Sequence, residues 1–486
     1  MTNWIPQTVK SYHLSFIGGL SILAVLIFFQ LFELIFGLIA VLPLILLLKL
    51  ATRDGSIEIR LLSVGYMVGQ TVCWIIGFLG CFYIFPAIGV IPKIGALIVS
   101  IEYPRTTMFL INMVMWGSLL GSLLAFPYQR TKKNTIFLSP SKKIIHYGIG
   151  VTAIVFIIFV VANYYNGALN ARVSIGSTMS VNSVLYWLSG LGVIPYLFFI
   201  FLGSFLHPSL LCTRNFIIVL ILLMSMYMVS LTGGRGHIFR IAIFFLGGSV
   251  YSKVDHKKLK IIAAGLLLCF FFLFVSVDAA RQSNFFSSGI QHRLGLTGQL
   301  VTDLQKRWKH YTHRIFFRFA NDLAGQLVIE NVTENKTYIG FQNFERLPTI
   351  FLPKFIIGDK PSADDGRERL KETYDLPITN FWAPPITFMA DSFERGGYST
   401  TFLTSFLLSF WLTLLGRLIY KLPIPFFKSL LIIVFFYQTI MLQAFSVIGA
   451  IREVTYSFAR DAVLVGGVFF LIYVITHKRG ESTLPE

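Results

Sequence analysis

Two arginines and a histidine stand close together in one short polar stretch between apolar runs. The stretch reads SLTGGRGHIFR, from Ser230 to Arg240, and carries Arg235, His237 and Arg240. Arginine presents a planar fork of N–H donors that matches the oxygens of a phosphate group. The glycine turn leaves backbone N–H groups free, and the N-terminus of the following helix adds partial positive charge. These residue types at this spacing predict a phosphate site at the start of a helix, whereas the lone His237 is interpreted as structural.

A second group of basic residues follows in a long polar stretch. Residues 279–320 carry seven basic residues against one acid. Within LQKRWKHYTHRIFFRFA, helical spacing places several of them on one stripe of a helix. Two interpretations stay open: a helix that rests on anionic lipid headgroups, or a surface that binds a particular phosphorylated ligand. The stripe consists of Arg307, His310, Arg314 and Arg318.

An acidic side chain stands shortly before the next apolar run, within ITNFWAPPITFMADSFERGGYST. Asp391 is a candidate general base, because a carboxylate near a cationic patch can accept a proton from an attacking hydroxyl. The alternative is that Asp391 pairs with a neighbouring arginine for structural reasons, and the sequence does not decide between the two. Gly396 and Gly397 predict a tight turn immediately before the run.

The composition shows which elements must hold these side chains. Of 486 residues, 55% are hydrophobic and only 13% are charged, and the mean hydropathy is +0.71. Soluble domains contain about 25% charged residues, so a membrane protein is expected. The net charge of +18 does not indicate nucleic acid, because most basic residues outside the long polar stretch fall in short loops between apolar runs. The four cysteines form no CxxC motif, so neither a zinc site nor a disulfide framework is expected.

Apolar runs recur along almost the whole sequence. About twelve can be delimited, several close to the ~20 residues that cross the hydrocarbon layer. Lipid offers the backbone no hydrogen-bonding partner, so the runs predict an all-α polytopic membrane protein. The first run is interpreted as a retained helix rather than a signal peptide. The runs are residues 12–29, 32–50, 62–87, 106–127, 146–164, 184–206, 215–232, 237–252, 261–278, 399–417, 427–447 and 460–477.

The basic residues predict how the helices are oriented. With both termini in the cytoplasm, the inner loops are rich in lysine and arginine and the short outer loops carry few. The chain then divides into a transmembrane bundle at 1–278 of about nine helices, a large periplasmic loop at 279–398, and a bundle at 399–486 of about three helices with a cytoplasmic tail. A loop of this length is expected to have structure of its own, and we expect it to be largely helical.

Three short motifs resemble those of bacterial polysaccharide repeat-unit polymerases, the Wzy-type O-antigen polymerases. SLTGGRGHIFR resembles their SGSRG-type motif, and LPKFIIGDKP resembles a Pro-Arg segment that ends in Asp-Lys-Pro. TFMADSFERGGY resembles the acid–aromatic–glycine stretch that precedes the helix after their large loop. The helix number and the single late loop also match, over most of residues 215–460. The chain departs from the family at 232–234, where TGG replaces SGS, and at Lys354, which lacks the fork of an arginine.

The resemblance implies an inverting glycosyltransferase of the glycosyltransferase-C-like class, without a metal or other cofactor. A growing glycan leaves undecaprenyl diphosphate and joins a sugar hydroxyl of a new lipid-linked repeat unit at the periplasmic face of the bacterial inner membrane. Such a reaction needs positive charge at the leaving diphosphate and an acceptor for the hydroxyl proton. The candidate acceptors are Asp391 and, second, His313. The candidates for binding the diphosphate are Arg235, Arg240, Arg281, Arg314 and Arg318, and those for other substrate contacts are Lys354, Lys360 and Arg395.

The expected partners are the undecaprenyl-diphosphate-linked oligosaccharide, as donor and as acceptor, membrane lipids, and a chain-length regulator protein. Two other functions stay open. An O-antigen ligase would use the same donor and transfer the glycan to a lipid A core sugar. A flippase or transporter for lipid-linked oligosaccharides would also use twelve helices, but it would need no long outer loop, and its charges would gather near mid-membrane. A metal-dependent transferase would carry acids in the first outer loop, near which only Glu33 stands.

Overall fold

The chain is helical in almost every part that its structure describes. The computed structural model describes residues 32–78, 93–94, 97–98, 104–126, 141–165, 192–209, 212–230, 235–252, 254–282, 323–351, 369–370, 372–374 and 386–478. Within these ranges the strands are β1 (Lys93–Ile94) and β2 (Leu97–Ile98), which pair antiparallel.

Helices are found in the predicted apolar runs and also within the long polar stretch. Each run that contains described residues holds one or more helices, whereas run 12–29 lies outside them. Run 32–50 is divided between two helices, because Pro43 lacks the N–H that would continue the first one. The helices are α2 (Phe32–Ile39), α3 (Leu42–Asp54), α4 (Ile57–Gln70), α6 (Pro104–Ala125), α7 (Lys142–Tyr165), α9 (Leu197–Ser204), α10 (Thr213–Ser230), α11 (Arg235–Ser249), α12 (His256–Gln282), α14 (Leu323–Asn335), α15 (Leu347–Phe351), α18 (Phe388–Tyr420), α19 (Pro425–Met441), α20 (Val447–Arg452) and α21 (Phe458–Lys478), with shorter helical turns at η1 (Thr71–Phe78), η3 (Ile194–Tyr196), η5 (Phe344–Arg346), η6 (Leu442–Ala444) and η7 (Glu453–Ser457).

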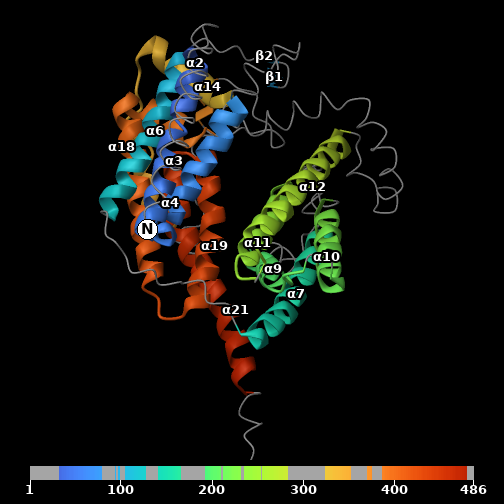
Figure 1. Cartoon of the computed structure of the whole chain (residues 1–486). Helices are drawn as coiled ribbons and strands as arrows, with labels where there is room; N and C mark the ends of the chain where they lie inside the picture. The colour runs from blue at the N-terminus through green and yellow to red at the C-terminus, as the bar shows by residue number, and fades with distance from the viewer. Residues whose placement is uncertain are drawn as a thin grey trace, which may run out of the picture.

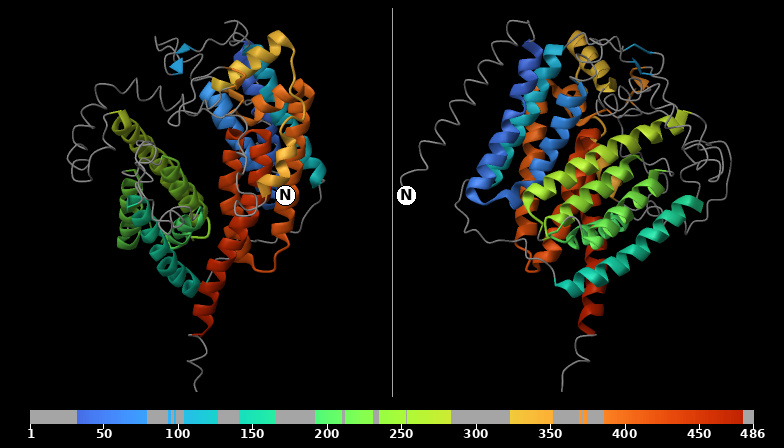
Figure 2. Two further views of the ribbon diagram at one scale, coloured as in Figure 1. Left: turned by 180° about the vertical axis from the view of Figure 1, so that it is seen from behind. Right: turned by 45° about the vertical axis from the view of Figure 1, so that its right-hand side comes forward.

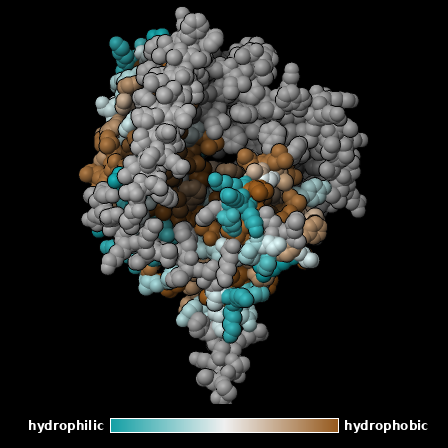
Figure 3. Space-filling view, in the orientation of Figure 1, coloured by the Kyte–Doolittle hydropathy of each residue, from teal (hydrophilic) through white to brown (hydrophobic). Residues whose placement is uncertain are grey.

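The protein is a helical membrane protein. Its described part contains five helical stretches that are long and apolar enough to cross a bilayer. Side chains such as Phe216, with 69% of its surface exposed, and Leu267, with 70%, project outward from the helices. Figure 3 shows such hydrophobic residues on the described surface, as expected where lipid is the solvent. The five stretches are Arg105–Ala125, Lys142–Ala162, Phe388–Tyr420, Pro425–Ala444 and Val447–Thr476, and shorter apolar helices lie at Ile194–Ser204, Thr213–Val229 and Gly236–Ser249.

The helices form two groups (Figures 1 and 2). In the first group α18 packs against α6 and α4, and α19 also packs against α4. In the second group α9 contacts both α11 and α7, and α11 contacts α10 and α12. Two helices join the groups, because α19 also touches α11 and α21 touches both α19 and α7.

Glycines allow the closest helix contacts in the first group. A Cβ built on Gly121 of α6 would lie 2.2 Å from the carbonyl oxygen of Phe406 on α18, and one on Gly117 would lie 2.6 Å from that of Phe402. The pair forms a GxxxG motif, whose missing side chains let two helix backbones approach within a membrane. Gly69 of α4 meets α19 at a similar distance.

Replacing Gly121 with alanine is expected to destabilise the protein by about 1–3 kcal/mol, because the added methyl group overpacks a contact between two backbones. Thermal unfolding in detergent measures this loss. Gly150→Ala is the matched control, since nothing lies within 4 Å of a Cβ added at that position of α7. Equal unfolding temperatures for the two variants would show that α6 and α18 do not pack as described.

One end of the first helix group, which we call the basic end, is held by a buried arginine. Arg60 is fully buried and forms an ion pair with Asp54 at 3.3 Å. It also donates hydrogen bonds to the carbonyl oxygens of Ser122 and Phe126, where α6 ends. Arg417, near the end of α18, lies over the Phe126 ring at 5.9 Å. The end of α6 therefore meets the turn between α3 and α4 and the end of α18.

The opposite end of the bundle, which we call the far end, contains the starts of α6, α11, α18 and α21. There Thr107 of α6 donates to Gln326 of α14, so part of the long polar stretch packs on the far end. Figure 1 shows α14 above α6 and α18. This places the described part of residues 323–351 at the end away from Arg417 and Asp54.

The helix after the long polar stretch begins earlier than predicted. It starts at Phe388 rather than at 399, and residues 388–395 form a helical segment of their own before a sharp kink at Gly396 and Gly397. Gly397 has a φ of 73°, a left-handed conformation that favours glycine. The two glycines thus produce the predicted turn, but it lies inside α18, and the segment before it is buried.

Candidate functional site

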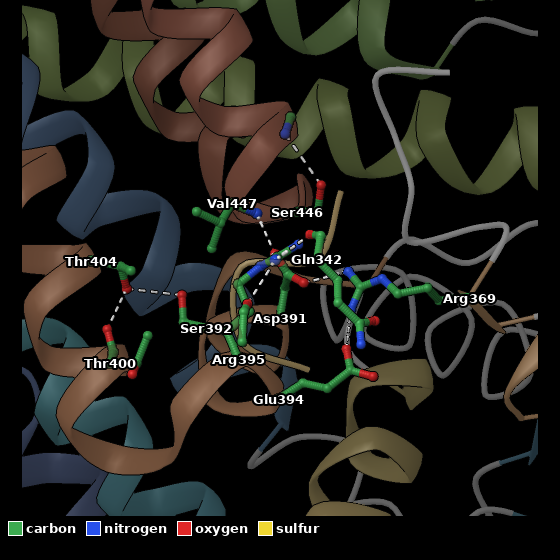
Figure 4. Close-up of polar contacts among 12 residues, drawn as sticks. Gln342, Arg369, Asp391, Ser392, Glu394, Arg395, Thr400, Thr404, Ser446 and Val447 are labelled. Carbon is green, nitrogen blue, oxygen red and sulfur yellow. Dashed lines mark hydrogen bonds and ion pairs between the residues drawn. The ribbon is translucent and has the colours of Figure 1, made fainter. Parts of the chain in front are cut away.

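The largest buried charge cluster of the described chain surrounds Asp391 (Figure 4). The Asp391 side chain is fully buried and pairs with Arg369 through Oδ1 and with Arg395 through Oδ2, the latter at 3.1 Å. Oδ2 also accepts a hydrogen bond of 2.7 Å from the backbone N–H of Val447, where α20 begins. Three donors from three separate parts of the chain therefore meet on one carboxylate.

Glu394 completes the charges of this cluster. Its carboxylate pairs with the same Arg369 guanidinium and accepts a hydrogen bond of 2.9 Å from the hydroxyl of Tyr374. Burial and the Glu394 carboxylate raise the pKa of the Tyr374 hydroxyl, so it stays protonated and donates. Two acids and two arginines balance each other, and we call this set, with Tyr374, the Asp391 network: Arg369, Tyr374, Asp391, Glu394 and Arg395.

The Asp391 network fixes described parts of the long polar stretch to α18. Arg395 donates to the carbonyl oxygens of Gly340 and Gln342 and lies over the ring of Phe344. In return, the backbone N–H groups of Ile339 and Gly340 donate to the carbonyl oxygens of Glu394 and Arg395 at 3.0 and 3.1 Å. These carbonyls are free because the helix is interrupted at the kink that follows. Residues 339–344 and the start of α18 therefore form one unit.

Arg240 lies at the far end in a different environment. Its Nε donates to the hydroxyl of Tyr437 at 2.9 Å, and its guanidinium lies 5.5 Å from the ring centre of Tyr196 and 5.4 Å from that of Tyr437. The Tyr196 hydroxyl is hydrogen-bonded to Nδ1 of His237, and the two rings are stacked. We call these four residues the Arg240 cage. Among the described residues the contacts of Arg240 are with these tyrosines, and none of them is with a carboxylate.

The structure brings together Asp391 and Arg395 among the predicted site residues and places Arg240 in the separate cage. The contacts of Asp391 are those expected if it pairs with arginines for structural reasons. Its role as a general base stays a prediction. Arg235 is the first residue of α11 and Arg281 lies near the end of α12, but their side chains are outside the described part. The remaining candidates lie outside the described residues: His313, Arg314, Arg318, Lys354 and Lys360.

Arg369, Glu394 and Tyr374 are site residues that the sequence did not single out. Arg369 stands in RERLKETY, a charged stretch whose pattern gives no reason to choose one arginine over another. Glu394 follows Asp391 by three residues, a spacing that places both on one side of a helix. This spacing is the sequence feature that indicates Glu394 as a partner of the same site. In the described part, no three His, Cys, Asp or Glu side chains gather where they could hold a metal ion.

The fold and these clusters define a helical membrane protein with charged and polar side chains buried at the far end of its bundle. Comparison with models of protein families, with curated proteins and with solved structures gave no match.

Proposed function

We propose that this protein is a glycosyltransferase of the bacterial inner membrane that polymerises undecaprenyl-diphosphate-linked repeat units at the periplasmic face. The glycan on one lipid diphosphate is transferred to a sugar hydroxyl of another lipid-linked unit, and undecaprenyl diphosphate leaves. The motifs that resemble repeat-unit polymerases support the reaction, and the Arg240 cage supports a site for its leaving group.

The observation that carries the proposal is the cation of Arg240 within an apolar helix. A charged side chain inside a bilayer costs about 2.5–3.5 kcal/mol even on insertion scales, so it is retained where it has a role. The hydroxyl of Tyr437 accepts a hydrogen bond from Nε of Arg240 and fixes the plane of the guanidinium. The two terminal nitrogens, which form the fork, then suit the oxygens of a diphosphate.

The Asp391 network supports the same proposal in another way. It joins the long polar stretch to the mouth of α18 at the end of the bundle where Arg240 lies. Polymerisation needs two large glycans to be held over one reacting centre, and a fixed stretch beside the helix mouth is suited to that task.

Reconstituted protein tests the function directly. Vesicles that contain the purified protein receive an undecaprenyl-diphosphate-linked repeat unit, and the glycans are separated on a gel, with protein-free vesicles as control. A ladder of products is expected. A single glycan transferred to lipid A core, with no ladder, would instead identify a ligase, and movement of the lipid between leaflets without any new glycosidic bond would identify a flippase.

A further inference from the structure

A second polar cluster lies next to the Arg240 cage, where α19 meets the start of α21. The Nε2 group of Gln438 donates to Oδ2 of Asp461, and Nε of Arg460 donates to Oδ1 at 2.8 Å. The Asp461 side chain is fully buried, whereas 42% of the Arg460 side chain is exposed. Two donors therefore fix the plane of one buried carboxylate.

The same two segments position Asp461 and Arg240. Gln438 directly follows Tyr437 on α19, so neighbouring residues contact Asp461 and Arg240. The other segment runs from Gly192 to Tyr196: a Cβ built on Gly192 would lie 3.7 Å from Oδ1 of Asp461, and the Tyr196 ring faces Arg240. The same two segments thus hold the Asp461 carboxylate and the Arg240 guanidinium at the far end.

The amide of Gln438 has an unused oxygen. Its Nε2 is engaged by Asp461, while its Oε1 is buried and accepts no hydrogen bond within the described structure. A buried acceptor without a donor is unfavourable and is rare in folded proteins. The hydroxyl groups of a sugar are donors that suit this oxygen.

Asp461 is a better candidate than Asp391 to receive a substrate hydroxyl. Two buried arginines and the N–H of Val447 surround the Asp391 carboxylate. Asp461 has one amide and one arginine, and that arginine is partly exposed. The Asp461 carboxylate therefore has fewer donors than that of Asp391, and one of them belongs to a partly exposed side chain.

We propose that Asp461 and Gln438 form the acceptor-sugar site of this protein, an inference that rests on the proposed function. The oxygen of the acceptor hydroxyl bonds to the anomeric carbon of the donor glycan. The bond from that carbon to the phosphate oxygen breaks, and its electron pair leaves with the diphosphate beside Arg240. The hydroxyl proton passes to the carboxylate of Asp461. Oε1 of Gln438 accepts a hydrogen bond from a second hydroxyl of the same sugar.

Steady-state kinetics with the undecaprenyl-diphosphate-linked repeat unit test this proposal. Asp461→Asn keeps the size of the side chain and one of its two acceptor oxygens but removes its charge, and it is expected to lower kcat by about 100-fold or more. Thermal stabilisation by undecaprenyl diphosphate should stay unchanged, because Arg240 is intact. Asp461→Glu should restore part of kcat, whereas Gln438→Met should mainly raise KM. Asp255→Asn, at an exposed acid before α12, is the matched control.

The outcomes separate this proposal from the function on which it rests. If wild-type protein gives neither a ladder nor a single addition, the proposed function itself is wrong. If it gives a ladder and Asp461→Asn retains wild-type kinetics, the acceptor site is wrong. If Asp461→Asn lowers activity and the unfolding temperature together, and Asp461→Glu restores neither, Asp461 is structural and the proposal is overturned.

Discussion

Replacing Arg240 with alanine is expected to lower the rate of glycan polymerisation by about 100- to 1,000-fold. The reason is that in the proposed reaction a leaving diphosphate develops negative charge inside an apolar bundle, where a fixed guanidinium stabilises it far more than water-exposed charge can. The measurement is the initial rate of ladder formation in vesicles at saturating repeat unit. Binding of undecaprenyl diphosphate, followed by thermal stabilisation, should weaken in parallel.

The geometry of the cage predicts a graded series. Arg240→Lys keeps the charge but loses the hydrogen bond to Tyr437 and the planar fork, so its activity should lie between wild type and Arg240→Ala. Tyr437→Phe keeps the ring beside Arg240 and removes only the hydroxyl that fixes Nε, so a smaller loss is expected.

A matched control is available at the basic end. Arg417 also lies over an aromatic ring, that of Phe126, but it is exposed and lies at the basic end, whereas the cage lies at the far end. Arg417→Ala should therefore form the ladder at the wild-type rate. Wild-type activity in Arg240→Ala would show that the cage does not bind the leaving group. Loss of activity in both variants would show that the effect of removing an arginine is not specific to the cage.

The helices could be predicted from the sequence because the signal is local. An apolar run long enough to cross lipid must satisfy its own backbone, so composition alone selects a helix. The kink inside α18 was also predictable, since two adjacent glycines mark it. The earlier start of α18 could not be predicted, because the charged residues Asp391, Glu394 and Arg395 are typical of a loop. They are helical and buried because arginines and acids neutralise each other there.

The clusters could be predicted only in part, because their contacts join distant residues. Arg240 was selected by its spacing, but Tyr437, which fixes it, is 197 residues further along the chain. Arg369 precedes Asp391 by 22 residues and lies in a stretch without periodicity. Sequence spacing can indicate that an acid stands near an arginine. It cannot indicate how many donors surround the acid, and this number decides between a base and a structural ion pair.

Replacing Asp391 with asparagine is expected to destabilise the protein by about 3–5 kcal/mol, because it leaves a net positive charge in a buried network that was neutral. Arg369 keeps Glu394 as a partner, but Arg395 loses its acid, and both side chains remain buried. The measurements are thermal unfolding and hydrogen exchange at the Ile339 and Gly340 amides, which donate to α18. Exchange at both amides should accelerate.

The double variant Asp391→Asn with Arg395→Gln restores neutrality, and its loss of stability should be smaller than the sum of the two single losses. Glu372→Gln, at an exposed acid of the same stretch, should change neither quantity. The same experiment decides the role of Asp391. A structural acid gives a loss of stability, and the remaining folded protein still polymerises. A general base gives full stability with polymerisation lowered by about 100-fold or more. Three donors on one buried carboxylate favour the first result.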